Sequence, residues 1–304
     1  MKKTYLIIDT KLVAYYMFHR GQDILSSIGF LAELAVKNLP KQRFGSITPI
    51  FVMDKGKSRR AEFFKEYKAH RKGLIKKQGD AYVKKQKHFE KEYQLLEGLF
   101  SICGKTLNIK GLEADDLASI ISSFAKVENI VFATSDGDWV RFMADKRFSM
   151  LHINRQKLIN FSNIPEEFEV PSPYYKLVKD IFCGVRKENV SGLKRLGEKT
   201  FKKIVDKVGL DIDVIKVEVE SLLGKNKLQL PDDVDNLDEM LDRNTKLFTP
   251  MVVDDMRDSE KEDFKRQWAL KSSRSLDDVI NYTAETLGRV HLPSEFEQNL
   301  FKLS

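Results

Sequence analysis

Three short apolar runs in the first half of the chain are each followed by an aspartate, and this pattern constrains the fold most. The runs at 5–8, 49–53 and 129–134 precede Asp9, Asp54 and Asp136. Continuous apolar runs of this length are typical of parallel strands that are buried on both faces. Helical spacing of apolar residues lies between them, as in 30–38, 89–103 and 114–124. The alternation predicts an α/β fold with a parallel-sheet core.

A proline-rich stretch predicts where this core ends. Residues 164–173 hold three prolines, and beyond them apolar spacing is helical while strand-like runs become rare. A chain of 304 residues is long enough for one large domain or two smaller ones. We therefore expect a core over 1–170 and a mostly helical region over 171–304.

Positive charge is concentrated in one segment. The chain carries a net charge of +7, and 55–87 holds 13 Lys or Arg residues against three acids, Glu62, Glu66 and Asp80. A concentrated positive field beside a neutral or acidic body favours a polyanion partner, which we expect to be nucleic acid. The alternative is an ordinary solvated helix surface.

Other sequence features bear on where the protein acts. We expect no membrane span, because no apolar run approaches the ~18 residues that a span requires. The N-terminus lacks the long apolar stretch of a signal peptide. The two cysteines, Cys103 and Cys183, form no metal-binding pair and are expected to stay reduced. These features favour a reducing cytoplasm.

Further acids accompany the three strand-end aspartates. Glu113, Asp115 and Asp116 open the helical pattern at 114–124, and Asp138 follows the third run. Ligand sites in open α/β sheets lie beyond the carboxyl ends of the strands, so we expect these side chains to converge there. Oxygen-only ligands favour Mg²⁺, with Mn²⁺ able to substitute, and two such ions can clamp a phosphate. Taken singly, each acid also fits a helix cap or a tight turn.

The sequence gives little support for other kinds of active site. The segment 192–200 resembles a phosphate-binding P-loop, but Glu198 interrupts the required Gly-Lys pair. The chain holds no G-x-S-x-G or H-E-x-x-H motif, and its five histidines show no ligand spacing.

The motifs taken in order resemble a known family. They begin with Asp9 and Met53-Asp54, and continue with Arg60-x6-Tyr67-Lys68-Ala69-His70-Arg71, Glu113-Ala-Asp-Asp116, Ser135-Asp-Gly-Asp138-Trp139 and Gly192-Leu-Lys-Arg-Leu-Gly197-Glu-Lys-Thr200. This order over about 4–207 resembles the 5′-nuclease superfamily of flap endonucleases and 5′–3′ exonucleases. The bacteriophage branch, which includes phage enzymes called RNase H, is similar in length and in the Ser-Asp-Gly-Asp-Trp motif.

The resemblance implies a PIN-like core with two metal clusters and a helical arch at about 55–90. It implies metal ligands at Asp9, Asp54, Glu113 and Asp115 with Asp116 nearby, and at Asp136 and Asp138. In the arch, Lys68 and Arg71 would act on the scissile phosphate, Tyr67 would stack on a base, and Arg60 and Lys72 would contact the strand.

The resemblance also implies a helix–hairpin–helix element at about 184–207. Its backbone amides and the residues Gly192, Gly197, Lys199 and Thr200 would grip duplex phosphates, with K⁺ as a further cofactor. One departure lies just before it. The family has Gly-Asp-x-x-Asp-Asn there, and this chain has Val185 and Glu188 in place of the two aspartates. Val185 cannot bind a metal, Glu188 can, and Asp180 one helical turn earlier is a candidate replacement.

We therefore predict a monomeric, metal-dependent 5′-nuclease that cuts flapped, nicked or RNA-primed DNA in replication or repair. Its partners would be branched or nicked DNA and RNA–DNA hybrid, and a replication clamp or single-strand-binding protein is a candidate protein partner. Val185 supports the alternative of a catalytically weak, structure-specific DNA-binding protein. A ribonuclease acting on single-stranded RNA is a third reading, which the duplex-gripping motif disfavours.

Overall fold

The computed structural model describes residues 2–71, 73, 77–272 and 275–287. Their contacts divide the chain into two compact units. The sheet unit draws its described residues from Met1–Ser58, Gln78–Asn163 and Met251–Ser304, and the helical unit from Arg59–Lys77 and Ile164–Pro250. Neither unit is continuous in sequence, so the units do not coincide with the ranges 1–170 and 171–304. The division into a nuclease core and a duplex-binding region along those ranges stays a prediction.

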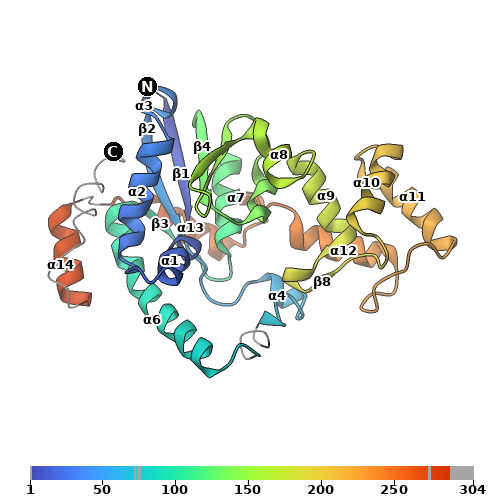
Figure 1. Cartoon of the computed structure of the whole chain (residues 1–304), viewed down its shortest axis with the longest axis horizontal. Coiled ribbons are helices and arrows are strands. Elements are labelled where there is room, and N and C mark those ends of the chain that lie inside the picture. Colours follow the sequence, from blue (N-terminus) through green and yellow to red (C-terminus); the bar gives the residue numbers. More distant parts are fainter. Residues whose placement is uncertain (1, 72, 74–76, 273–274, 288–304) are drawn as a thin grey trace. The chain divides into compact units, whose positions relative to one another are not determined.

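A six-stranded sheet forms the centre of the sheet unit. Its strands are β1 (Lys3–Asp9), β2 (Ser46–Val52), β3 (Lys105–Leu107), β4 (Asn129–Thr134), β5 (Phe148–His152) and β6 (Lys157–Asn160). They lie in the order β3-β2-β1-β4-β5-β6 (Figure 1). All neighbours are parallel except β5 and β6, so the sheet is mixed. The expected α/β class is confirmed, and the antiparallel edge strand is a difference from the expected parallel sheet.

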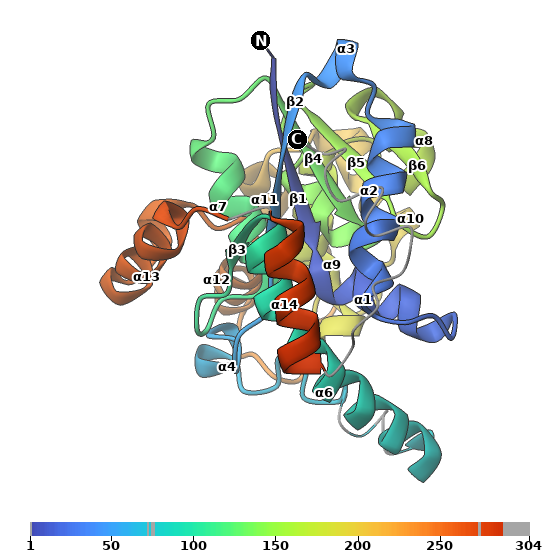
Figure 2. The same ribbon diagram turned by 90° about the vertical axis from the view of Figure 1, so that its left-hand side faces the viewer.

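Helices cover both faces of this sheet, which explains the unbroken apolar runs. The sheet unit contains α1 (Thr10–His19), α2 (Ser26–Asn38), α3 (Lys41–Phe44), α6 (Asp80–Cys103), α7 (Ala114–Phe124), η1 (Gly137–Phe142), η2 (Phe161–Asn163), η4 (Val253–Asp255), α13 (Asp258–Ala269) and α14 (Leu276–Leu287). Figures 1 and 2 show α1 and α2 on one face and α7 on the other. Leu6, Ile7 and Ile8 point alternately to the two faces and are fully buried.

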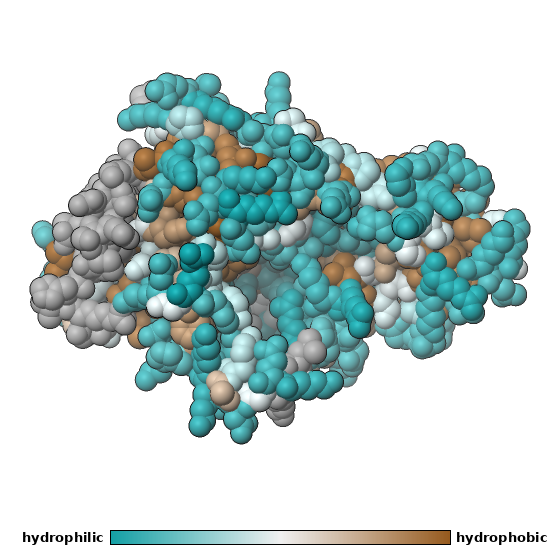
Figure 3. Space-filling view, in the orientation of Figure 1, coloured by the Kyte–Doolittle hydropathy of each residue, from teal (hydrophilic) through white to brown (hydrophobic). Residues whose placement is uncertain are grey.

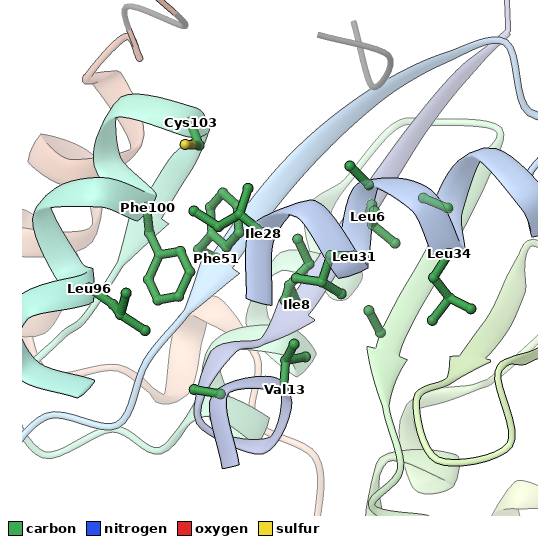
Figure 4. Packing of buried hydrophobic residues seen from close by; sticks show 14 of the residues in the cluster. Leu6, Ile8, Val13, Ile28, Leu31, Leu34, Phe51, Leu96, Phe100 and Cys103 are labelled. Carbon is green, nitrogen blue, oxygen red and sulfur yellow. The ribbon is translucent and has the colours of Figure 1, made fainter. Parts of the chain in front are cut away.

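Close packing fixes the face that carries α1, α2 and α6. Leu6 and Ile8 lie among side chains of α2 such as Leu31 (Figure 4). Phe51 on β2 stacks on Phe100 of α6, with ring centroids 4.8 Å apart. Burial of such large apolar side chains contributes about 1.5–3 kcal/mol each, so this face is a main source of stability.

The last described helix packs against α6, as Figure 2 shows. The Tyr282 hydroxyl donates to the carbonyl of Leu95 at 2.6 Å. Gly98 makes this approach feasible, because a Cβ at that position would lie 2.4 Å from the Tyr282 ring. The chain therefore returns to the sheet unit after it has formed the helical unit.

The helical unit holds short helices around a small hairpin. Its elements are α4 (Arg60–Phe63), α8 (Ile164–Phe168), α9 (Pro173–Cys183), β7 (Gly184–Val185), η3 (Arg186–Glu188), β8 (Val190–Ser191), α10 (Glu198–Val208), α11 (Ile212–Gly224) and α12 (Leu237–Phe248). Ser172 caps α9 by accepting from the Tyr175 N–H at 3.0 Å, and Pro173 occupies the first helical position. Asn244 of α12 donates to the carbonyls of Ile181 and Ser191, which ties α12 to the hairpin.

The proline-rich stretch at 164–173 forms α8, a short link and the first residue of α9. Among the described residues, no helix is long and apolar enough to cross a membrane. On the face seen in Figure 3, hydrophilic side chains predominate, and the hydrophobic ones form small separate patches.

Candidate active site

The strand order places the three strand-end aspartates beside one another. Asp9 is the last residue of β1, while Asp54 and Asp136 each follow their strand by two residues. Strand β1 lies between β2 and β4 and is parallel to both. The direction in which the chain adds strands reverses between β1 and β4, which is where ligands bind in sheets of this kind. The convergence that the sequence predicted is therefore present in the sheet unit.

Asp9 is held in place by two hydrogen bonds. The Leu12 N–H donates to its Oδ1 at 3.2 Å, and the Thr134 hydroxyl donates to its Oδ2 at 3.0 Å. Burial raises the pKa of Asp9 to about 7, and repulsion from Asp54 and Asp136 adds to this shift. The raised pKa of Asp9 thus reflects its burial first and the neighbouring negative charges second.

Asp54 connects the sheet edge to the start of α7. Its Oδ1 accepts from the Ala114 N–H at 2.8 Å. Burial raises the pKa of Asp54, the Ala114 bond lowers it, and repulsion by Glu113 and Asp115 raises it further. The positive charge of Lys11 opposes that repulsion only in part, so the pKa stays raised.

The three acids at the start of α7 form one cluster. Ligand oxygens of Glu113, Asp115 and Asp116 lie within 4.8 Å of one another. Asp116 is buried and accepts from the Glu113 N–H at 3.0 Å, so it also caps the helix. Asp115 accepts from the Asp116 N–H at 3.0 Å. The helix-cap alternative considered from sequence thus applies to Asp116, which can serve both roles.

The Ser-Asp-Gly-Asp-Trp motif divides its two aspartates between different contacts. Asp136 caps η1 and accepts from the Asp138 N–H at 3.1 Å. Asp138 is only 6 % exposed, and its Oδ2 lies 3.9 Å from Nη2 of Arg141. Trp139 packs edge-on against Phe132, with ring centroids 5.5 Å apart, which anchors the turn to the sheet. Asp136 therefore joins the strand-end carboxylates, while Asp138 is buried beside a cation.

The donor set fits hard divalent cations. Five carboxylates from four segments are brought together: Asp9, Asp54, Glu113, Asp115 and Asp136. All offer oxygen ligands. Burial and, after it, repulsion from Asp54 and Asp136 raise the pKa of Asp9, and a bound cation would relieve that repulsion.

Lys68 and Arg71, the two predicted catalytic side chains, lie in the helical unit. Glu188 is ion-paired with both side chains: its Oε1 accepts from Nη2 of Arg71 at 2.9 Å, and its Oε2 lies 3.4 Å from Nζ of Lys68. Val185 lies in β7 and offers no ligand atom. Asp180 is buried and pairs with Lys176 at 2.8 Å, so its carboxylate already has a cation partner.

Two further arch residues are covered in this structure. Tyr67 is 7 % exposed, with the Arg60 Nη1 donating to its hydroxyl at 3.4 Å and the Lys68 Nζ 4.8 Å from its ring centroid. Base stacking by Tyr67 would therefore require its ring to be uncovered. The expected contact residue Lys72 lies outside the described residues.

The predicted phosphate-gripping residues flank the start of α10. Gly197 precedes the helix and has open space where a side chain would stand, and Lys199 is exposed in the first turn. The Thr200 N–H donates to the Gly197 carbonyl at 3.0 Å. Close packing requires a glycine at position 192, because a Cβ on Gly192 would lie 2.0 Å from the backbone of Cys183.

The sequence matches the family described as 5′-3′ exonuclease, N-terminal resolvase-like domain, over residues 4–169. The chain belongs to this family. It is therefore a hydrolase of the 5′–3′ exonuclease type, and the resemblance inferred from its motifs is confirmed. No curated protein matched the sequence.

Solved structures with the same fold support the assignment of architecture. A flap endonuclease of bacteriophage T5, in a pseudo-enzyme-product complex with DNA and metal ions, is 18% identical with a TM-score of 0.65, covering 94% of this chain and 98% of that one. The catalytic core of Rad2 with DNA substrate is 15% identical with a TM-score of 0.53, covering 100% and 92%. Human GEN1 with Holliday junction DNA is 12% identical with a TM-score of 0.54, covering 99% and 71%.

Two neutral side chains at this exonuclease's carboxylates escaped the sequence analysis. Thr134 donates to Asp9 and accepts from the Asp136 N–H at 3.1 Å, so it links two strand ends. Tyr93 of α6 shares a 2.6 Å hydrogen bond with Thr10, and burial together with the charges of Asp54 and Asp9 raises its pKa. Thr134 directly precedes the acidic turn and could have been noticed, but Tyr93 gives no local signal in the middle of a helix.

Proposed function

We propose that this 5′-3′ exonuclease hydrolyses phosphodiesters near the 5′ end of flapped, nicked or RNA-primed DNA, in Okazaki-type primer and flap removal. The observation that carries the proposal is the meeting of Asp9, Asp54 and Asp136 with Glu113 and Asp115 in one site. The T5 enzyme with this fold was crystallised with DNA and metal ions, which supports the same substrate class here.

The five convergent carboxylates would hold Mg²⁺, for which Mn²⁺ would substitute. Asp116 and Asp138 remain proposed ligands from the family motifs, although each has a protein contact of its own. The motifs also offered Glu188 as a ligand, but in this structure its carboxylate is paired with Lys68 and Arg71. When bound, the cations would supply a hydroxide nucleophile at neutral pH and stabilise the leaving oxygen.

The chain's own residues would position the substrate. Lys68 and Arg71 would donate to the scissile phosphate and stabilise the charge that develops on it. Thr134 would keep the carboxylate of Asp9 oriented through its hydrogen bond. Exposed amides at the start of α10, with Lys199 and K⁺, would grip phosphates of the duplex.

The direct test is a 5′-labelled flap duplex incubated with the full chain in Mg²⁺ or in excess EDTA. We expect short labelled products in Mg²⁺ alone, and their lengths separate flap incision from exonucleolytic trimming. A matched RNA strand, which a single-strand ribonuclease would prefer, is the substrate control. Tight binding without products in Mg²⁺ or Mn²⁺ would instead favour the catalytically weak DNA-binding protein, for which Val185 is the main support.

One substitution tests the carboxylate assignment. Asp136→Asn should lower turnover far more than DNA affinity, because Asn keeps the shape and removes the charge that a cation needs. Asp145→Asn is the matched control, since Asp145 lies in the same unit with its side chain 47% exposed. Equal losses of turnover and affinity in Asp136→Asn would count against a metal role.

A monomer in a bacterial or phage-infected host cytoplasm, recruited by a clamp or a single-strand-binding protein, is our proposal for the setting. It rests on the sequence features alone.

A further inference from the structure

Glu188 stands where the family pattern has an aspartate, yet its described contacts are with cations. Both carboxylate oxygens are engaged, Oε1 by Arg71 at 2.9 Å and Oε2 by Lys68 at 3.4 Å. The Glu188 side chain is 9% exposed, whereas those of Lys68 and Arg71 are 24% and 49% exposed. The anion is therefore the fixed, covered partner, and the two cations reach toward it from the more open side.

Backbone contacts hold the two segments in register. The Lys68 N–H donates to the Glu188 carbonyl at 2.8 Å, and Nδ2 of Asn189 donates to the Glu66 carbonyl at 2.9 Å. Lys68 and Asn189 both have left-handed backbones, with φ of 57° and 58°. Such conformations are uncommon for residues other than glycine and persist where neighbouring contacts enforce them. The ion pairs are thus part of a built contact within the helical unit.

A carboxylate and a phosphodiester make the same demands on these cations. Both present anionic oxygens, and the arginine fork binds either one through paired N–H donors. While Glu188 accepts from Arg71 and is ion-paired with Lys68, a substrate phosphate must compete with it for the same two side chains.

We propose that Glu188 is an anionic placeholder: it occupies Lys68 and Arg71 in the DNA-free enzyme and yields them to the substrate phosphate. The inference rests on the proposed function, because it takes these two cations as the phosphate contacts. Glu188 then sets how tightly the enzyme binds a 5′ end. It acts through Lys68 and Arg71 and is therefore a positioning residue.

The test is Glu188→Gln, which keeps the side-chain shape and removes the competing charge. Binding of a 5′-flap duplex is measured in EDTA, so that neither metal nor cleavage contributes. We expect affinity to rise by roughly three- to tenfold, the range for release of a partly exposed ion pair up to a charged hydrogen bond. The salt dependence of DNA binding should steepen by the amount expected for about one additional phosphate contact. In cleavage assays, KM should fall.

Two comparisons make the result specific. Asp242→Asn removes the same charge from an exposed pair with Lys246 on α12 and reports the general effect of one negative charge fewer. Adding Glu188→Gln to a Lys68→Ala/Arg71→Ala double variant should not raise the DNA affinity of that double variant. Thermal unfolding of each variant verifies that it is folded.

An unchanged or weakened affinity of Glu188→Gln in EDTA would overturn the proposal. So would an affinity gain that survives in the double-variant background or equals that of Asp242→Asn. If Glu188→Gln instead raised only the Mg²⁺ concentration needed for cleavage, Glu188 would be a metal ligand and the placeholder role would fall. A gain in EDTA from an enzyme that cleaves nothing would support the placeholder while contradicting the nuclease function.

Discussion

Replacing Asp9 by asparagine should stabilise the metal-free protein at alkaline pH. Burial, together with repulsion from Asp54 and Asp136, raises the pKa of Asp9 from its ordinary 3.8 to about 7. A carboxyl whose pKa is raised on folding favours the fold only while it is protonated, so stability is lost as pH rises from about 4 to about 7. At about 1.4 kcal/mol for each pH unit, the loss approaches about 4 kcal/mol above pH 7. Asparagine carries no charge and therefore avoids this loss of stability. Its Oδ1 can still accept from the Leu12 N–H.

Urea unfolding in EDTA, followed by tryptophan fluorescence, measures this effect. Trp139 and Trp268 both belong to the sheet unit that contains Asp9, so the signal reports on the relevant unit. We expect Asp9→Asn to exceed the wild type by about 2–4 kcal/mol at pH 8 and by under about 1 kcal/mol at pH 4. Asp145→Asn should show no such pH-dependent gain.

In Mg²⁺ the wild type should become more stable than Asp9→Asn, because a cation that binds only the folded wild-type site stabilises that protein. A gain that is equal at both pH values would refute the reasoning. So would a metal-free Asp9→Asn protein that is less stable than the wild type at pH 8.

Three further predictions concern the arch, the contact surface and the α14 contact. Lys68→Ala should lower single-turnover cleavage by roughly 10²-fold, the scale of a lost electrostatic donor; Lys65→Ala, on an exposed neighbour, gives the effect of one charge fewer, and equal losses would remove Lys68 from the mechanism. Affinity for duplex DNA should fall steeply between about 50 and 200 mM salt, and a flat titration would argue against the basic segment 55–87 as a contact surface. Gly98→Ala should destabilise the packing of α14 on α6 by roughly 1–3 kcal/mol, because its Cβ would overlap the Tyr282 ring. Limited proteolysis checks this against Gly224→Ala, which meets no neighbouring atom, and equal resistance of the two would contradict it.

The sequence by itself determined the elements that carry the carboxylates. An apolar run followed by Asp9 or Asp54 is a local pattern, and burial on both faces of a parallel strand requires it. The helix start at Glu113 is likewise local, since its acids complement the first turn of α7. These patterns were sufficient to predict the α/β core and the edge of the sheet where the acids meet.

Only the tertiary structure decided which side chains become partners. Glu188 meets Lys68 and Arg71 across more than 100 residues of sequence, and Thr134 reaches Asp9 across 125. The short strands β3, β5 and β6, and the return of α13 and α14 to the sheet unit, likewise depend on contacts between distant segments. Periodicity records which face of an element is buried, but it does not record what lies against that face. The carboxylate site could therefore be predicted from local patterns. The contacts of Lys68 and Arg71, and the contacts that shift the pKa values of the carboxylates, could not.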